Sequence, residues 1–469
     1  MSPLPDPVGK QADVVHLATN EHNVVLGTAG TGKTTMAIHR AVHLAHPATA
    51  NHGPVLLVTF NNALVSYLRH LAPPGADITM ETYGLFARGY LNSRGQMPAY
   101  NGIAQKARQR ALVAQGLAAV RATYPRSNVL GRDLGWIQDE LSWIAGMGIT
   151  TEADYQQAKR VGRQTPLATG GARSGIWMVL QAYREARQAT GARYDWTDIA
   201  SAVRAELAKD GTARRYRHVV IDEGQDLSPE ALRSLTEVVQ PGGSVTFFGD
   251  YHQAIYGQGL SWRSAGIELG GRPVELFVDN YRNTAAIAKL AIALSQTAPM
   301  AADDEDLVVP RAPVAAGPPP TLAITKDHAQ EVALVREQAV EFAKDQKVAI
   351  LARTWALAQS AAAGLSYSKL DGERVREWRE APGIWVGPYH AAKGLEFDAV
   401  IMPFLDEARI PWPDVKAAFD PAEADAREAR LLYVAITRAR SQLLLTHTGT
   451  LTHLLPFSGT GLWKEVDLR

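Results

Sequence analysis

Gly27-Thr28-Ala29-Gly30-Thr31-Gly32-Lys33-Thr34 is the stretch that decides the fold of this chain. It fits the pattern G-x-x-x-x-G-K-S/T, a loop whose backbone N–H groups surround phosphates, while the lysine reaches the β- and γ-phosphates and the hydroxyl binds Mg²⁺. Residues 24–26 before it are typical of the end of a buried strand, and residues 35–42 after it are typical of a helix. The N-terminus of that helix would direct partial positive charge at the anion. The sequence therefore predicts a nucleotide-phosphate site at a strand-to-helix turn.

The composition predicts a multidomain globular protein without a membrane segment. The chain has 469 residues, too many for one ordinary core, and 46% of them are hydrophobic and 20% charged. No apolar run reaches the length that crosses a bilayer, and the N-terminal residues lack the basic and apolar regions of a signal peptide. The absence of cysteine excludes disulfides, thiol catalysis and cysteine-based zinc sites. We expect a cytoplasmic protein with no membrane partner.

Charge is balanced over the whole chain but not along it. Lys+Arg and Asp+Glu each number 48, which gives a formal net charge of zero. Residues 101–210 hold 15 Lys+Arg against 10 Asp+Glu, so this stretch carries +5 and the rest of the chain −5. A local basic face on a neutral protein can track nucleic-acid phosphates, and a solvated helical surface explains the same excess equally well.

Apolar runs that alternate with helical patterns predict an α/β fold with two parallel sheets. The first group of strand candidates is 55–60, 78–84 and 218–223. After an acidic and proline-rich stretch at 303–320, a second group follows at 348–351, 384–386, 399–402 and 442–445. Residues 92–205 are mostly helical in pattern, and the tryptophans there suit its core better than a nucleic-acid platform: Trp136, Trp143 and Trp177. In such sheets, ligands bind at the carboxyl ends of the strands.

Two carboxylates close one of these strands. Asp222 can hold Mg²⁺ through water, and Glu223 can orient and deprotonate an attacking water, as an NTPase requires. Upstream of the phosphate loop, Gln11 carries an amide that can both donate to and accept from the edge of adenine. These residues predict the rest of a nucleotide site.

Two aromatic residues fall at predicted strand ends. Phe60 and Tyr83 would lie at the carboxyl rim of the sheet, where an exposed aromatic stacks on a base with about 1–3 kcal/mol. Each of them also fits a place in the core, and for each alone the core is slightly favoured.

The order of these pieces resembles the motifs of UvrD/Rep-type superfamily 1 (1A) DNA helicases, from Gln11 to about Leu445. The strongest elements after the phosphate loop are Asp222-Glu223-Gly224-Gln225-Asp226, Gly249-Asp250 with Gln253-Ala254-Ile255-Tyr256, Asn280-Tyr281-Arg282, His390-Ala391-Ala392-Lys393-Gly394-Leu395-Glu396-Phe397 and Tyr433-Val434-Ala435-Ile436-Thr437-Arg438-Ala439. The resemblance implies two RecA-like parallel-sheet motor domains with a helical accessory insertion in the first.

The resemblance also implies roles around ATP and Mg²⁺. The nucleotide would be bound by Gln11 at adenine, Arg40 and Tyr281 on either side of its ring, Glu396 at the ribose, and Gly27, Thr28, Ala29, Gly30, Thr31, Gly32, Lys33, Thr34 and Thr35 around the phosphates. Thr34 and Asp222 would hold the metal. The catalytic set would be Lys33, Glu223 as base, Gln253 as γ-phosphate sensor, and Arg282 and Arg438 approaching the γ-phosphate from the cleft. An arginine finger in that position contributes about 10³–10⁵ in rate.

For DNA, the resemblance implies single-strand contacts that are largely independent of base sequence, made by Phe60, Tyr83, Tyr256, Trp262 and His390. One departure concerns Trp262. Residues 257–261 stand between the Ile-Tyr motif and Trp262-Arg263, whereas the corresponding Trp-Arg pair of the family follows shortly after that motif.

By the resemblance, residues 1–91 and 206–283 form the first motor domain (1A), residues 92–205 a 1B-like helical insertion, and residues 284–469 the second motor domain (2A). Full-length members carry a large helical subdomain, 2B, inside the second motor domain. Here about thirty residues, from Arg353 to Gly383, separate the corresponding strands, so 2B is reduced or absent. Because 2B is implicated in autoregulation and duplex contact, this departure bears on unwinding more than on translocation.

The activity implied is that of an ATP- and Mg²⁺-dependent single-stranded DNA translocase or helicase with 3′→5′ polarity, acting on single-stranded or tailed DNA. The alternative is an ATP-dependent DNA-binding switch in a repair or anti-phage assembly, with a nuclease or repair activity supplied by a separate protein. A metabolic P-loop kinase is a third possibility, but it does not explain a second α/β domain with arginines and no phosphate loop. Strand displacement by the isolated chain distinguishes the first two.

Overall fold

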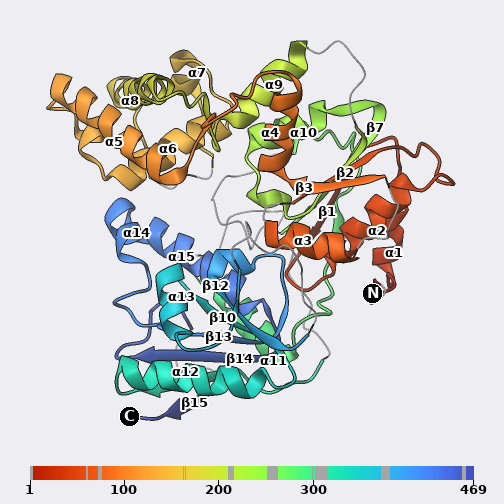
Figure 1. Ribbon diagram of the computed structural model, residues 1–469, viewed down its shortest axis with the longest axis vertical. Coiled ribbons are helices and arrows are strands. Elements are labelled where there is room, and N and C mark those ends of the chain that lie inside the picture. The colour runs from red at the N-terminus through yellow and green to blue at the C-terminus, as the bar shows by residue number, and fades with distance from the viewer. Residues whose placement is uncertain are drawn as a thin grey trace.

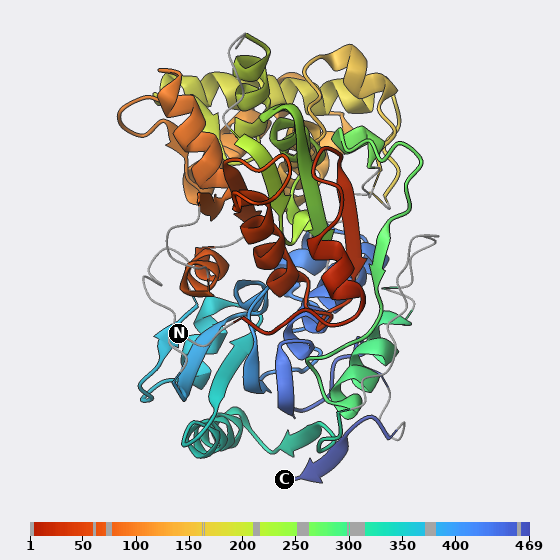
Figure 2. The same ribbon diagram turned by 90° about the vertical axis from the view of Figure 1, so that its right-hand side faces the viewer.

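The computed structural model describes residues 4–59, 62–71, 77–161, 163, 165–209, 216–250, 262–297, 300, 315–370, 381–456 and 461–469. Two parallel sheets and a helical lobe make up this part of the chain. In Figure 1 the lobe lies at the upper left, the first sheet at the upper right and the second sheet below. Figure 2 shows the lobe, the first sheet and the second sheet one above another.

The first sheet has six parallel strands among the described residues. Their order across the sheet is β3 (Ile78–Thr82), β2 (Val55–Thr59), β6 (Tyr216–Ile221), β7 (Val239–Gly249), β1 (Asn23–Gly27) and β8 (Glu275–Phe277). Pairs such as Val25 with Phe248 fix the register. Because side chains alternate along a strand, Val24 and Leu26 enter one hydrophobic cluster while Val25 enters another. Both faces of the sheet are therefore covered, as a parallel sheet requires.

Helices cover both faces of this sheet. One face carries α1 (Lys10–Val15), α2 (Lys33–Ala45) and α3 (Asn62–Leu71), and the other carries α4 (Tyr83–Ser93), α9 (Ile199–Lys209) and α10 (Pro229–Glu237). Local signals start them: Thr82 caps α4, and Ser228 caps α10 with a proline in its first turn. Since α9 packs with α4 and α10, the expected boundary at residue 205 falls inside a helix that belongs with the first sheet.

The helical lobe consists of α5 (Lys106–Thr123), the 3₁₀ turn η1 (Asn128–Gly131), α6 (Leu134–Gly146), α7 (Glu152–Gln157) and α8 (Gly171–Ala189). Trp136, Trp143 and Trp177 are buried in its core, as predicted. A short parallel pair that was not predicted, β4 (Ile103–Ala104) with β5 (Tyr194–Asp195), joins the chain where it enters and leaves the lobe. None of the helices described is both long and apolar enough to span a bilayer.

The second sheet has seven parallel strands among the described residues. Their order is β11 (Ser368–Lys369), β12 (Gly383–Pro388), β10 (Lys347–Ala352), β13 (Phe397–Met402), β14 (Ala439–Thr448), β9 (Thr321–Thr325) and β15 (Lys464–Asp467). Its helices are α11 (Ala285–Ser295), α12 (His328–Phe342), α13 (Trp355–Ala361), α14 (Pro413–Ala418) and α15 (Pro421–Ile436). Hydrophobic clusters lie on both of its faces. The predicted fold class, α/β with two RecA-like sheets, is confirmed.

Candidate functional site

The phosphate loop leaves β1 at Gly27 and enters α2 at Lys33. Gly30 and Gly32 have φ angles of 82° and 85°, a left-handed conformation that glycine adopts without strain. The Thr31 hydroxyl donates to the Thr28 carbonyl over 3.0 Å and closes the turn. Since α2 begins directly after the turn, its free N–H groups and the positive end of its dipole lie at the loop. The loop thus has the conformation of an anion-binding cradle.

Lys33 is 6% exposed, and its ammonium group is held by the loop itself. Nζ donates to the carbonyls of Gly27 and Thr28 over 2.8 and 2.6 Å and lies 3.6 Å from Asp250 Oδ2. Burial lowers the pKa of Lys33, and the neighbouring Asp250 offsets part of that effect. To reach a bound phosphate, the ammonium group has to exchange these two carbonyls for phosphate oxygens.

Of the two residues expected at the adenine ring from the first sheet, one lies at the loop and one does not. Gln11 donates from Nε2 to the Thr31 carbonyl over 3.0 Å, so its amide rests against the loop, and base reading stays a prediction. Arg40 is fully buried, and it donates to Thr246 Oγ1 over 3.3 Å and to three carbonyls at and after the end of α1. Its guanidinium group is used inside the fold, so the structure does not place Arg40 against adenine as expected. Thr35, in the first turn of α2, is half-buried.

Asp222 and Glu223 directly follow β6, and both carboxylates are buried. Glu223 has a φ of 54°, which is uncommon for a residue with a side chain, and it accepts from Gln225 Nε2 over 2.6 Å. Burial and the charge of Glu223 raise the pKa of Asp222 to about 7. Burial would also raise the pKa of Glu223, but Lys393 and Lys33 outweigh it and hold that pKa below its ordinary value. The pair therefore joins an ionised candidate base to a carboxyl group that releases its proton near neutrality.

The donor set fits a nucleotide phosphate with Mg²⁺. Both carboxylate oxygens of Asp222 are buried without a hydrogen-bond partner among the described residues, and the Thr34 side chain is near enough to lower the pKa of Asp222. The Thr28 hydroxyl is likewise buried without a partner there. No group of three or more His, Asp or Glu residues able to hold a metal occurs in the described chain. Mg²⁺ binds through one or two protein groups together with waters and substrate phosphates, and Thr34 and Asp222 are groups of that kind.

A strap of residues 280–283 lies against the loop. Tyr281 N donates to the Gly30 carbonyl over 2.8 Å. The Asn280 side chain covers Gly30 so closely that a Cβ on this glycine would lie 2.1 Å from Asn280 Oδ1. The Tyr281 side chain is 58% exposed, which leaves its ring open to stacking on a base.

The two arginines of the predicted catalytic set lie where the strap meets the second sheet. Arg282 Nη2 is 2.6 Å from Glu396 Oε1, so the carboxylate expected at the ribose is engaged by an arginine here. Arg438 is 1% exposed and donates to the Val434 carbonyl over 2.9 Å. Burial and the charge of Arg282 lower the pKa of Arg438 to about 10, and Arg438 in turn helps to lower the pKa of Glu223. The structure thus places Arg282 beside the Glu396 carboxylate and Arg438 near the Glu223 carboxylate.

Lys393 is a site residue that sequence reasoning missed. It follows the 3₁₀ turn η5 (Tyr389–Ala392) of the second motor region and is fully buried. Its Nζ lies 2.7 Å from Asp226 and 3.9 Å from Glu223 Oε2, both in the first motor region. Asp226 was an indirect signal for such a residue, because a carboxylate that becomes buried needs a cation or hydrogen-bond donors beside it. The sequence does not show that Lys393 is that cation.

The expected DNA contacts are only partly placed. Phe60 and Tyr256 lie outside the described residues, as does the predicted γ-phosphate sensor Gln253. Tyr83 is half-buried, and its hydroxyl lies 2.7 Å from Ser234 Oγ. The Trp262 ring packs edge-on against the Phe247 ring, with 4.6 Å between the two ring centroids. Both rings pack against the hydrophobic core of the first sheet, so the structure presents neither as an open stacking surface.

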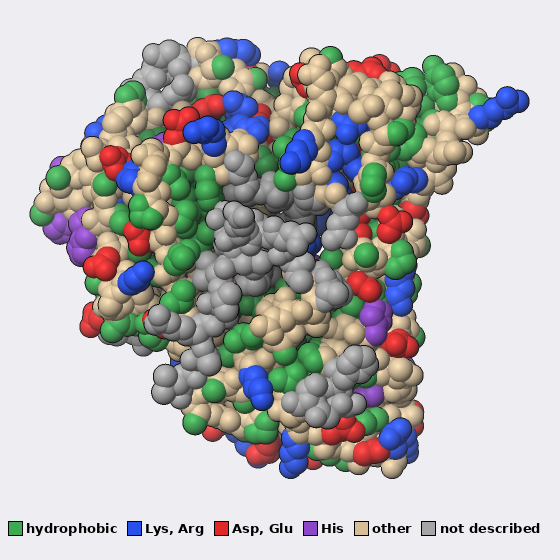
Figure 3. Space-filling model, turned by 180° about the vertical axis from the view of Figure 1, so that it is seen from behind, with side chains coloured by type: hydrophobic (Ala, Val, Ile, Leu, Met, Phe, Trp, Pro, Cys, Tyr) green, Lys and Arg blue, Asp and Glu red, His purple; other side chains and the backbone are tan. Residues whose placement is uncertain are grey.

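His390 and Trp196 are two further aromatic residues that are exposed to solvent. His390 is exposed, and its pKa is lowered to about 4 by partial desolvation and by the charges of Lys106 and Arg353. Trp196, which sequence reasoning missed, is 41% exposed and lies against Gly84, whose missing Cβ would be 3.0 Å from the indole. Figure 3 shows one face of the molecule, on which Lys and Arg are intermixed with Asp and Glu outside the residues drawn in grey.

Comparison with known proteins matches both regions that hold the site. The UvrD/REP helicase N-terminal domain matches residues 8–270, and the UvrD-like helicase C-terminal domain matches residues 362–450. DNA helicase IV of Escherichia coli K12 is 24% identical over 475 residues, which cover 91% of this chain and 66% of that protein. The ATP-dependent DNA helicase UvrD2 of Mycobacterium bovis is 24% identical over 541 residues, which cover 90% of this chain and 76% of that protein. A solved C-terminal domain of a possible DNA helicase from a Lactobacillus covers 39% of this chain at 23% identity, with a TM-score of 0.28.

Proposed function

Because the chain belongs to the UvrD/Rep helicase family, we propose that it is an ATP- and Mg²⁺-dependent translocase or helicase on single-stranded DNA. One observation carries the proposal: two regions of the chain far apart in sequence build a single composite site. Glu223 of the first region is influenced by Lys393 and Arg438 of the second, and the strap from Asn280 to Asn283 lies between them. A site divided in this way changes when the two sheets move relative to each other.

The residues of the chain divide the chemistry of ATP hydrolysis. Thr34 and Asp222 would hold Mg²⁺, which would supply positive charge against the negative charge that develops on the phosphates. Glu223 would accept the proton of the attacking water, a task for which its lowered pKa keeps it ionised at neutral pH. Lys33 and Arg438 would stabilise negative charge on the transferring phosphoryl group.

For the nucleic acid we propose a single strand that passes the exposed His390 and Trp196 rings, with the positive charge of Lys106 near His390. Stacking on such rings tolerates any base. The 3′→5′ polarity, a cytoplasmic location and ATP as the nucleotide belong to the same proposal and rest on the family resemblance. So does the division into 1–91 with 206–283, 92–205 and 284–469, except that α9 (Ile199–Lys209) is assigned to the first domain.

The alternative keeps the same site but gives it to a regulatory subunit. The chain spans 66% of DNA helicase IV, and about thirty residues stand where full-length members carry 2B. An ATP-dependent DNA-binding switch that works beside a separate nuclease or repair protein would retain DNA-stimulated hydrolysis without strand displacement.

The experiment that tests the proposal is ATP hydrolysis by the wild-type chain and by Glu223→Gln, with and without single-stranded DNA. We expect the wild type to be strongly stimulated by single-stranded DNA, and Glu223→Gln to bind nucleotide but lose about 10²–10⁴-fold in turnover. Glu341→Gln, which changes an exposed carboxylate on α12, is the matched control and should behave as the wild type. Substantial residual hydrolysis by Glu223→Gln would remove its assignment as base. A rate that single-stranded DNA, duplex and RNA all leave unchanged would remove the motor function.

A further inference from the structure

Away from the nucleotide site, the helical lobe touches the second motor region directly. α14 packs on α6, and Phe419, directly after α14, packs against the hydrophobic core of the lobe. A Cβ on Gly135 of α6 would lie 3.3 Å from the Cβ of Ala418 at the end of α14. The two helices therefore meet almost backbone to backbone at this point.

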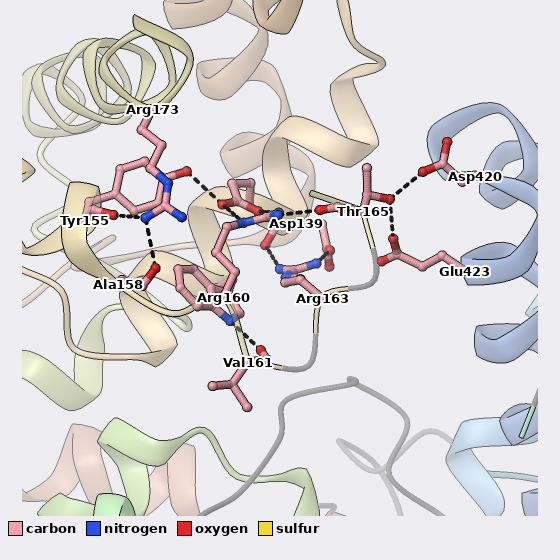
Figure 4. A network of polar contacts seen from close by, with 12 residues as sticks. Asp139, Tyr155, Ala158, Arg160, Val161, Arg163, Thr165, Arg173, Asp420 and Glu423 are labelled. Carbon is pink, nitrogen blue, oxygen red and sulfur yellow. Dashed lines mark hydrogen bonds and ion pairs between the residues drawn. The ribbon is translucent and has the colours of Figure 1, made fainter. Parts of the chain in front are cut away.

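Polar side chains on the same elements add to this contact, and Figure 4 labels Asp139, Arg163, Thr165, Asp420 and Glu423 among them. Asp139 of α6 accepts from both terminal nitrogens of Arg427 on α15, over 2.8 and 3.3 Å. It also pairs with Arg163 of the lobe (Figure 4). The Thr165 hydroxyl lies 2.5 Å from Asp420 Oδ2 and 3.0 Å from Glu423 Oε2. We call this contact the clasp: Gly135, Asp139, Arg163 and Thr165 on the lobe, and Ala418, Asp420, Glu423 and Arg427 on the second motor region.

In the second motor region, one helix, α15, connects the clasp to Arg438 of the nucleotide site. α15 carries clasp residues at its start and runs as one helix of 16 residues to Ile436, two positions before Arg438. At 1.5 Å per residue it spans about 24 Å. A helix of this length moves as a unit, so a displacement at the clasp is transmitted to the position of Arg438.

The lobe side of the clasp is tied to the other half of the site. The carbonyl of Met147, directly after α6, accepts from Arg233 of α10 over 2.9 Å. α10 begins at Pro229, three positions after Asp226. The carboxylates of the first sheet and Arg438 of the second region are thus connected through two routes, one across the nucleotide site and one through the clasp.

We infer that the clasp positions Arg438: it closes and opens together with the nucleotide cleft and sets how far Arg438 reaches toward Glu223. A rotation that withdraws Arg438 carries the start of α15 away from Asp139. Ion pairs around a small apolar contact suit an interface that breaks and re-forms, because separated charges regain water. The inference rests on the proposed function, since it concerns the same hydrolysis.

A reversible lock on the clasp is the direct test. The chain has no cysteine, so Gly135→Cys with Ala418→Cys allows one intramolecular disulfide. The 3.3 Å between the two Cβ positions is close to the roughly 3.5–4.5 Å that disulfides span, and the new Cβ at residue 135 requires only a small shift of the Asp133 carboxylate. We expect oxidation to lower DNA-stimulated turnover by about tenfold or more, because a locked cleft cannot reopen to release product, and reductant to restore it.

Single-cysteine variants at the same two positions are the matched controls and should not respond to the oxidant.

A second measurement weakens the clasp instead of locking it. We expect Arg427→Gln to lower kcat about fivefold while the KM for ATP changes little, since Arg438 is displaced and the phosphate loop is not, and Arg427→Lys to recover most of the loss. Equal turnover of the oxidised and reduced double variant would overturn the clasp inference and leave the motor function standing. If single-stranded DNA stimulates neither form nor the wild type, the proposed function fails, and this inference falls with it.

Discussion

Lys393 places one buried ammonium group between two carboxylates of the opposite motor region, 2.7 Å from Asp226 and 3.9 Å from Glu223. Among the neighbouring groups that lower the pKa of Glu223, Lys393 has the largest effect. We expect Lys393→Met to raise the pKa of Glu223. The base then becomes protonated at a higher pH, so the acidic limb of the pH–rate profile shifts to higher pH. DNA-stimulated turnover at neutral pH should fall about 100-fold. The measurement is kcat across pH.

Stability gives the control for this prediction. Removing one partner of a buried ion pair costs about 3–5 kcal/mol, so Lys393→Met should also unfold at a lower temperature. The double variant Lys393→Met, Asp226→Asn removes both charges and should regain much of that stability, while the displaced acidic limb persists. If the double variant also regains the wild-type pH profile, Lys393 acts on the fold and not on Glu223.

Single residues also show what sequence reasoning can and cannot reach. The loop from Gly27 to Thr34 was predictable because its conformation depends on its own glycines and on the helix that follows. Arg40 lies only six positions later, but its partners include Thr246, more than 200 positions away, and nothing local to α2 indicates that contact. Lys393 was missed for the same reason: its partner carboxylates belong to another part of the chain.

Among the structural elements, the strap at 280–283 couples the phosphate loop to the second sheet. Asn283 donates to the carbonyls of Thr437 and Ala439, which flank Arg438, while Asn280 covers Gly30. A Cβ at Gly30 would meet Asn280 at 2.1 Å and would have to adopt a φ of 82°. We therefore expect Gly30→Ala to push the strap away and lower turnover about 100-fold, as small misplacements of reacting groups do. DNA-stimulated ATP hydrolysis measures this effect.

Gly89 is the matched control for that substitution. It lies inside α4, and a Cβ there would have nothing within 4 Å. Gly89→Ala should leave turnover unchanged and add about 0.5–1 kcal/mol of stability, because alanine favours a helix. Wild-type turnover by Gly30→Ala would show that the loop and the strap are not closely fitted in solution.

Apolar runs predicted most interior strands of the second sheet, but not β9 (Thr321–Thr325), which lies between β14 and β15. β10, β12, β13 and β14 lie inside the second sheet, and their apolar runs indicated them. β15 lies at the sheet edge with the polar sequence Lys-Glu-Val-Asp, and β11 has two residues, so neither carries a hydrophobic pattern that a strand prediction could use. The pair β4 and β5 is equally short.

Over the whole molecule, the segment in which the family resemblance implies a 2B subdomain is short. β10 ends at Ala352 and β12 begins at Gly383, and the described residues between them contain only the short elements α13 and β11. The composite nucleotide site, by contrast, has both halves. On the proposed function, we therefore expect movement along a single strand more than separation of two strands.

We accordingly predict that the isolated chain translocates on single-stranded DNA but unwinds tailed duplexes poorly. ATP turnover should rise with the length of an oligonucleotide until it reaches a plateau, because a motor spends a larger share of its time moving on a longer strand. With 3′→5′ motion, the chain should displace streptavidin from a 5′-biotinylated strand and not from a 3′-biotinylated one, whereas strand displacement from a 3′-tailed duplex should be much slower under the same conditions. Glu223→Gln should abolish all three activities.

Turnover that is independent of strand length would contradict translocation. Rapid strand displacement by the chain alone would show that the lobe and the second sheet, without a 2B subdomain, are sufficient to separate a duplex.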